Sequence, residues 1–211
     1  MSDGQENRSR VEREQSAMSK EMEKILRWCV KQRNGKDLLS LLDRLSAEPS
    51  VTVRRRAAEM AGMAESIEIE QVEEIIRRLA GDADASVREA AAEGLGKLLG
   101  RAGQMKRVRI VGEWATSADR TQREAIAKSL RGYLNVLGDA PAIEHLSDDP
   151  EAPVRQATAD AATARAPTRP RRYADVLEKL SHDSNESVRI AARAGLNMTR
   201  KTYPEQGRGG A

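Results

Sequence analysis

An arginine, preceded by valine in four of five cases, recurs along the chain at intervals of 34, 35, 32 and 34 residues. The five positions are Arg54, Arg88, Arg123, Arg155 and Arg189. Self-similarity at this period is typical of stacked helix pairs, in which each unit buries its apolar face against its neighbours. The period therefore predicts an elongated stack of helices rather than a globule around one closed core.

Apolar residues keep fixed positions relative to each of these arginines. Large apolar side chains stand nine and twelve residues before it, and an alanine or leucine stands seven residues after it. The three columns are Leu45, Leu79, Trp114, Leu146 and Leu180; Leu42, Ile76, Val111, Ile143 and Leu177; Ala61, Leu95, Leu130, Ala162 and Leu196. Positions three apart share one face of a helix, so each unit supplies two helices with an apolar stripe. The prediction is an all-α fold, an α-solenoid with a right-handed superhelix of about five helix pairs.

Hydroxyl residues two positions before the arginines suggest where the second helices begin. Ser86 and Thr121 each precede a glutamate by three residues, which is the spacing of a capping box. We therefore expect these hydroxyls to act as N-caps. Pro153 takes the same position in the fourth unit and suits a first helical turn, where its missing N–H costs nothing.

The segments 82–96, 149–155 and 183–192 each begin with Asp and contain Val-Arg. They resemble HEAT repeats, more closely the bacterial HEAT-like type found in phycobilisome lyase subunits, over roughly residues 36–200. In that family a turn aspartate and a helix arginine link neighbouring repeats as a ladder. The resemblance implies a structural ladder made here by Asp82, Arg88, Asp149, Arg155, Asp183 and Arg189.

The ends of the chain differ from the repeat region. Residues 1–16 are polar and without periodicity, which predicts disorder. Residues 17–201 form the predicted solenoid, beginning with an N-terminal capping helix, and residues 202–211 form a flexible tail. No apolar signal region or stretch of about 18–20 apolar residues occurs, so we expect a cytoplasmic protein without membrane insertion.

Residues able to carry catalysis are few. The two histidines, His145 and His182, have no metal-ligand spacing. The one cysteine, Cys29, lies in an apolar stripe, which favours a packed, inert thiol. The sequence therefore assigns no catalytic, metal-binding or cofactor-binding residue, and we expect no enzyme activity.

The third unit departs from the repeat, and it lies in a basic stretch. Ser117, Gln122 and Trp114 stand where other units have an acid, a valine and a leucine, so Arg123 is expected to lack its ladder partner. Residues 100–138 contain eight Lys or Arg and three acids. Residues 139–160 contain six acids and one Arg, and residues 161–211 contain ten bases and five acids.

Repeats without a reaction centre favour a non-catalytic adaptor or scaffold that binds another protein, for example an acidic segment or helix. The candidate surface residues are Arg55, Glu59, Arg107, Arg109, Arg123, Lys128, Arg131 and Arg193. The alternative is nucleic-acid binding through the basic zones 101–131 and 165–201. A third function, implied only by the resemblance to lyase subunits, is a role in chromophore attachment.

Overall fold

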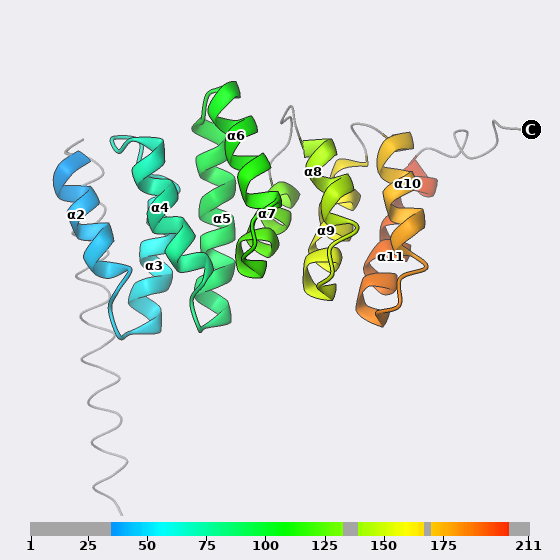
Figure 1. The fold of residues 1–211 in the computed structure, drawn as a ribbon, viewed down its shortest axis with the longest axis horizontal. Coiled ribbons are helices and arrows are strands. Elements are labelled where there is room, and N and C mark those ends of the chain that lie inside the picture. The colour runs from blue at the N-terminus through cyan, green and yellow to red at the C-terminus, as the bar shows by residue number, and fades with distance from the viewer. Residues whose placement is uncertain (1–34, 133–138, 167–169, 203–211) are drawn as a thin grey trace, which may run out of the picture.

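The computed structural model describes residues 35–132, 139–166 and 170–202, and these residues form ten helices and no strands. The predicted disordered segment, the capping helix and the tail from residue 203 onward lie outside the described residues. The helices form five successive pairs arranged in a row along the long axis of the molecule (Figure 1). This arrangement confirms the predicted all-α solenoid of helix pairs.

Each pair consists of a first and a second helix joined by a short turn. The first helices are α2 (Gly35–Leu45), α4 (Ile69–Ala80), α6 (Gln104–Ala115), α8 (Asp139–Leu146) and α10 (Pro170–Leu180). The second helices are α3 (Val51–Ala61), α5 (Ala85–Arg101), α7 (Arg120–Gly132), α9 (Ala152–Arg165) and α11 (Glu186–Thr202). All fifteen residues of the three apolar columns are buried, so the repeat pattern locates the core correctly.

The second helices begin earlier than the hydroxyl pattern predicts. The N-cap of α5 is Asp84, whose carboxylate accepts the backbone N–H of Ser86 at 2.8 Å, and Asp119 accepts that of Thr121 at 2.8 Å. The predicted N-caps Ser86 and Thr121 thus lie inside the first turn and donate their own hydroxyls to these carboxylates. A carboxylate also complements the positive end of the helix dipole, which favours it over a hydroxyl at this position. Pro153 lies in the first turn of α9, as predicted.

The second helices form a closely packed layer, whereas the first helices of neighbouring pairs contact each other less. Glycines permit the close approach. A Cβ at Gly94 of α5 would lie 2.7 Å from the carbonyl oxygen of Ala58 in α3, and one at Gly195 of α11 would lie 2.1 Å from Thr163 Oγ1 in α9. In a curved stack the more closely spaced layer lies on the inside, so we call the solvent-exposed face of the second helices the inner surface.

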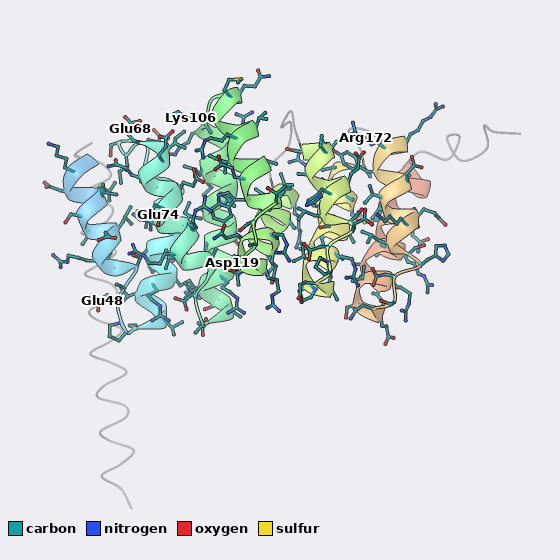
Figure 2. The ribbon with its side chains drawn as sticks, viewed as in Figure 1. Glu48, Glu68, Glu74, Lys106, Asp119 and Arg172 are labelled. Carbon is teal, nitrogen blue, oxygen red and sulfur yellow. The ribbon has the colours of Figure 1, made fainter. Side chains whose placement is uncertain are left out.

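A ladder of bidentate ion pairs connects the inter-helix turns of neighbouring repeats. These turns lie along one edge of the molecule, to which Glu48 and Asp119, labelled in Figure 2, belong. Each arginine donates Nε and Nη2 to an aspartate of the next repeat, and Nη1 to two backbone carbonyls of its own turn. The pairs, with their Nε–Oδ2 distances, are Arg54–Asp82 (2.6 Å), Arg123–Asp149 (2.6 Å) and Arg155–Asp183 (2.6 Å). The hydrogen bonds from Arg54 and Arg155 lower the pKa of the Asp82 and Asp183 carboxyls below their ordinary value.

Four of the six predicted ladder residues, Asp82, Asp149, Asp183 and Arg155, belong to these ion pairs. An arginine does not pair with the aspartate of its own turn, however, which is the pairing that the expected lack of a partner for Arg123 assumes. Arg88 does not bind the side chain of Asp82; its Nη1 donates to the backbone carbonyls of Asp82 and Ala83, both at 2.8 Å. Its carboxylate partner would come from the next repeat, where Ser117 stands, and no ion pair of Arg88 occurs within the described residues. Arg123, expected to be unpaired, is instead one of the three paired arginines. The expectation failed because each arginine reaches forward along the chain rather than back to its own turn's acid.

A different polar network replaces the missing ion pair between the second and third repeats. The buried carboxylate of Glu73 in α4 accepts the indole N–H of Trp114 at 2.9 Å, and it also pairs with Arg77 at 2.7 Å and Arg109 at 2.8 Å. The Arg77 guanidinium lies over the Trp114 ring, 4.9 Å from its centroid, and donates to Gln122 at 2.7 Å. The unusual residues of the third repeat thus act together at one junction.

Candidate binding surface

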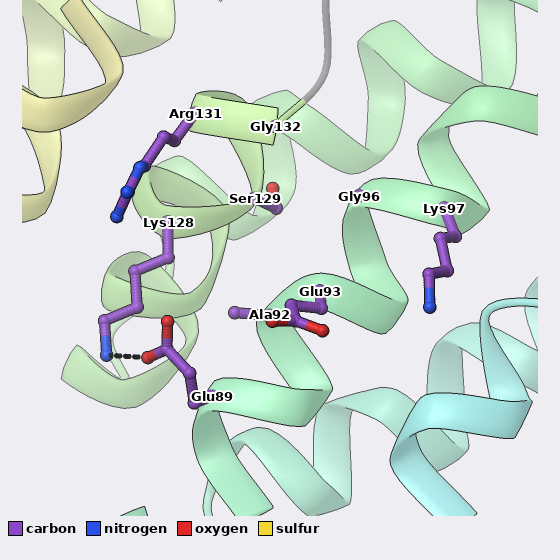
Figure 3. A pocket seen from close by; sticks show the side chains of 9 residues that line it. All are labelled: Glu89, Ala92, Glu93, Gly96, Lys97, Lys128, Ser129, Arg131 and Gly132. Atoms are coloured by element: carbon purple, nitrogen blue, oxygen red, sulfur yellow. Dashed lines mark hydrogen bonds and ion pairs between the residues drawn. The ribbon is translucent and has the colours of Figure 1, made fainter. Parts of the chain in front are cut away.

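Two adjoining hollows lie on the inner surface at the centre of the solenoid. The larger, about 510 Å³, lies between α5 and α7 (Figure 3), and the smaller, about 270 Å³, extends from them to α9. They share Glu89, Lys128 and Arg131, and we call them together the central groove. The remaining residues that line it are Ala92, Glu93, Gly96, Lys97, Ser129, Gly132, Glu124, Pro153, Gln156, Ala157 and Asp160.

Small side chains make the floor of the groove. A Cβ at Gly96 of α5 would lie 3.4 Å from the carbonyl oxygen of Ser129 in α7, so the two helices approach closely there. Ala92 and Ala157 add little height above the backbone. The same residues that let the second helices pack closely therefore leave a trough between longer, charged side chains.

Lys128 links α5 and α7 across this trough. Its Nζ lies 2.8 Å from Oε2 of Glu89, the contact drawn in Figure 3, and 3.0 Å from Oε1 of Glu124. Burial lowers the pKa of Lys128, but the hydrogen bonds that its ammonium donates to the two carboxylates outweigh this effect and raise the pKa above its ordinary value. Lys128 is therefore a cation neutralised by two carboxylates, which leaves that triplet with an excess of one negative charge.

The other charged residues of the groove make no ion pair within the described part of the chain: Glu93, Lys97, Arg131 and Asp160. Asp160 is half-buried, and burial raises the pKa of its carboxyl although the charge of Arg131 acts in the opposite direction. A half-buried carboxylate without a directly bound cation is a group that a ligand can satisfy.

Six of the eight predicted surface residues lie on second helices, and five of these lie on the solvent-accessible surface of that layer. Lys128 and Arg131 line the central groove. Arg55 and Glu59 lie on α3, where they face each other at 3.6 Å. Arg193 lies exposed on α11 at the other end.

The other three do not belong to this layer's free surface. Arg107 and Arg109 lie on α6, a first helix. Arg107 donates to two backbone carbonyls, at 2.9 and 2.7 Å, and Arg109 binds Glu73 and Glu113. Arg123, the third, is a ladder residue. The structure therefore does not bring the eight candidates together into one surface.

Most bases of the zone 101–131 already have partners inside the protein. Besides those just described, Arg101 donates to the carbonyl of Ile67 at 3.3 Å, Lys106 pairs with Glu70 at 2.9 Å, and Arg120 lies 3.8 Å from Glu151. Of the eight bases counted in this stretch, Arg131 alone has no such contact within the described residues.

The zone 165–201 is similar. Arg165 is buried and binds both the carbonyl of Leu130 and the carboxylate of Asp139, each at 3.0 Å. Arg172 pairs with Glu144 at 2.6 Å. Within the described ranges, neither zone forms a continuous basic surface of unpaired side chains.

The residues weighed for catalysis stay apart from one another. His145 is exposed on α8, and His182 lies in an exposed turn with its Nε2 3.5 Å from Glu178. Cys29 lies outside the described residues. Within the described ranges, no group of three or more His, Cys, Asp or Glu is placed to hold a metal ion, and no helix is sufficiently long and apolar to cross a membrane.

The carboxylates of the groove were not among the residues predicted from the sequence: Glu89, Glu93, Glu124 and Asp160. A signal was present, because these residues stand one or five positions after the repeat arginine. It was not used, because periodicity alone does not tell which exposed face of a second helix is the inner one.

Comparison with known proteins agrees with this fold. The family described as HEAT repeats matches residues 38–131. Among solved structures, smu.31 from Streptococcus mutans UA159 aligns with a TM-score of 0.65 and 19% identity over 89% of this chain and 94% of that one. AlkD2 from Streptococcus mutans aligns with a TM-score of 0.62 and 19% identity over 89% of each chain. Identities this low show likeness of fold alone. No curated protein matches the chain significantly in sequence.

Proposed function

Because the chain is a HEAT-repeat protein, we propose that it is a non-catalytic adaptor that binds a segment of another protein along the inner surface of its second helices. The central groove carries this proposal. It crosses three consecutive repeats, and it combines a floor of small residues with walls of charged side chains. Such a trough accepts a peptide backbone while its walls select side chains.

The charges of the molecule favour a protein partner over nucleic acid. Phosphate binding requires lysines and arginines that are free to release counterions. Seven of the eight bases in the zone 101–131 have an intramolecular hydrogen bond or ion pair, so binding DNA or RNA there requires breaking those contacts first.

The test is to fill the groove without disturbing the fold. Gly132 lines the groove and Gly112 lies on α6, and a Cβ at either position would meet no atom within 4 Å. We expect Gly132→Trp to abolish recovery of a stoichiometric protein partner from the native cell extract, whereas wild type and the control Gly112→Trp recover it equally. Equal recovery by all three proteins contradicts the proposal, and so does recovery of nucleic acid without any protein.

Nucleic-acid binding is tested separately by mobility shift at about 50 mM salt, where phosphate contacts are strongest. We expect no shift of duplex DNA or RNA. A shift that weakens when Arg107, Arg109 and Arg131 are changed to Glu would replace the proposed function with the nucleic-acid alternative.

A further inference from the structure

We infer that the partner segment is basic at one end and apolar at the other, with its apolar end on α11 and its basic residues over α5, α7 and α9. This inference rests on the proposed function and adds the chemistry and the orientation of the ligand. It follows from how the exposed residues of the inner surface change from one repeat to the next.

The positions one, five and nine residues after each repeat arginine lie on one face of every second helix, because they are four residues apart. They are solvent-accessible in all five repeats. From the first repeat to the last they are Arg55, Glu59 and Met63; Glu89, Glu93 and Lys97; Glu124, Lys128 and Gly132; Gln156, Asp160 and Ala164; Ile190, Ala194 and Met198.

An acidic line runs through the middle repeats. At positions one and five, the second to fourth repeats supply four carboxylates, Glu89, Glu93, Glu124 and Asp160, against one ammonium, that of Lys128. Four negative charges minus one positive leave three negative charges along this line. The remaining bases of the groove, Lys97 and Arg131, stand further along their helices, at positions nine and eight. A segment that contacts positions one and five of these helices therefore meets mainly carboxylates. The complementary charge on the segment is positive.

An apolar stripe takes the same positions in the last repeat. Ile190 and Met198 of α11 have exposed fractions of 62% and 60%, and the exposed Ala194 lies between them. Large apolar side chains at such exposure, at positions where the middle repeats carry mainly charged residues, are typical of a contact site. This stripe continues the acidic line, because α9 and α11 pack against each other as α5, α7 and α9 do.

Helix spacing sets the length of the segment. Packed helices lie roughly 8–10 Å apart, and an extended peptide advances roughly 3.3 Å per residue. A basic residue over Asp160 on α9 therefore stands about three residues from an apolar residue on α11. Basic residues over Glu89 and Glu93 on α5, three helix spacings away, stand about eight residues from it.

The experiment selects ligands from a random nine-residue peptide library displayed on phage, with the full chain as bait. We expect selected peptides to carry Leu, Ile, Met or Phe at one end and Lys or Arg about three and about eight residues away. Binding of the selected peptides is then measured by fluorescence anisotropy on variants whose fold is checked by circular dichroism.

Two pairs of variants test the two ends of the site. The groove variants Glu93→Lys and Asp160→Lys are each expected to weaken binding at least tenfold, whereas the control Glu74→Lys, on the outer layer, leaves binding unchanged. Ile190→Ser is expected to weaken binding several-fold, whereas Met105→Ser, at a residue 81% exposed on α6, has no effect.

Selection of acidic peptides, or of peptides that bind the two groove variants as tightly as wild type, overturns the inference. If such peptides nevertheless fail to bind the Gly132→Trp variant, the proposed function stands, and only the inferred charge and orientation of the ligand are wrong. If neither the library nor the cell extract yields a ligand, both the inference and the proposed function fail.

Discussion

Arg123 and Arg88 occupy equivalent positions in neighbouring central repeats, and they differ in one contact. Both donate Nη1 to two backbone carbonyls of their own turn, at 2.9 and 3.1 Å for Arg123 and at 2.8 Å for Arg88. Only Arg123 adds the bidentate pair with Asp149. Arg88→Ala is therefore an internal control, because the difference between the two alanine variants isolates the contribution of the carboxylate.

The size of that difference follows from burial and geometry. The side chains of Arg123 and Asp149 are 13% and 3% exposed. Exposed ion pairs stabilise by about 0–1 kcal/mol, whereas hydrogen bonds to charged groups contribute about 1.5–3 kcal/mol. We expect Arg88→Ala to lower the free energy of unfolding by about 1 kcal/mol and Arg123→Ala to lower it by about 3 kcal/mol.

Urea unfolding followed by circular dichroism measures both values, and a double-mutant cycle gives the coupling directly. We expect a coupling of about 1–3 kcal/mol between Arg123 and Asp149, and close to zero between Arg88 and Asp82. Equal losses for the two arginine variants would refute the ladder as a source of stability, and a strong coupling of Arg88 to Asp82 would refute the forward direction of pairing.

Three further predictions concern acid stability, the buried network and helix packing. The pKa of Asp183 is lowered in the folded protein, so its contribution to the free energy of unfolding is present above its unfolded pKa of about 3.9 and is lost as the pH falls through the folded value. In Asp183→Asn, the free energy of unfolding measured in urea should therefore fall less steeply below about pH 4 than in wild type. The same pH dependence in both proteins contradicts this prediction. Trp114→Phe removes the indole N–H that donates to buried Glu73 and should lower the free energy of unfolding, measured by thermal unfolding, by about 1–3 kcal/mol. A variant as stable as wild type would argue against a stabilising role of this network. Gly195→Ala introduces a Cβ that overlaps the Thr163 hydroxyl and should lower the free energy of unfolding by about 1–3 kcal/mol, whereas Gly112→Ala, in open space, should be neutral or stabilising. Similar effects at both sites would exclude the contact with Thr163 as the reason.

Sequence reasoning located the fold because burial repeats with the period of the chain. Every apolar column is buried, including Trp114 where the pattern departs from leucine. Sequence reasoning assigned the wrong ladder partners. Each of these arginines lies six residues after one turn residue, usually an acid, and 26 to 28 residues before the next ladder aspartate, and the repeat period is compatible with pairing to either. Only the direction of the guanidinium distinguishes them, and that depends on the packing between repeats.

The binding surface was harder to predict for a related reason. Charged residues occupy every exposed face of the helices, so their identity does not reveal which face is the inner one. Arg109 was predicted as a surface contact from its charge, yet it binds the buried carboxylate of Glu73. A count of basic residues therefore overestimated the free positive charge, because ion pairs between repeats use most of it.

The junction between the second and third repeats limits how this chain can change its length. Tandem repeats commonly expand or contract by whole units, since identical interfaces let any unit follow any other. Removing the third repeat would bring Arg88 up to Asp149 and create a normal ladder contact, but it would take Trp114 and Arg109 away from Glu73. Repeats two and three therefore depend on each other, and we expect repeats to be gained or lost during evolution elsewhere along the solenoid.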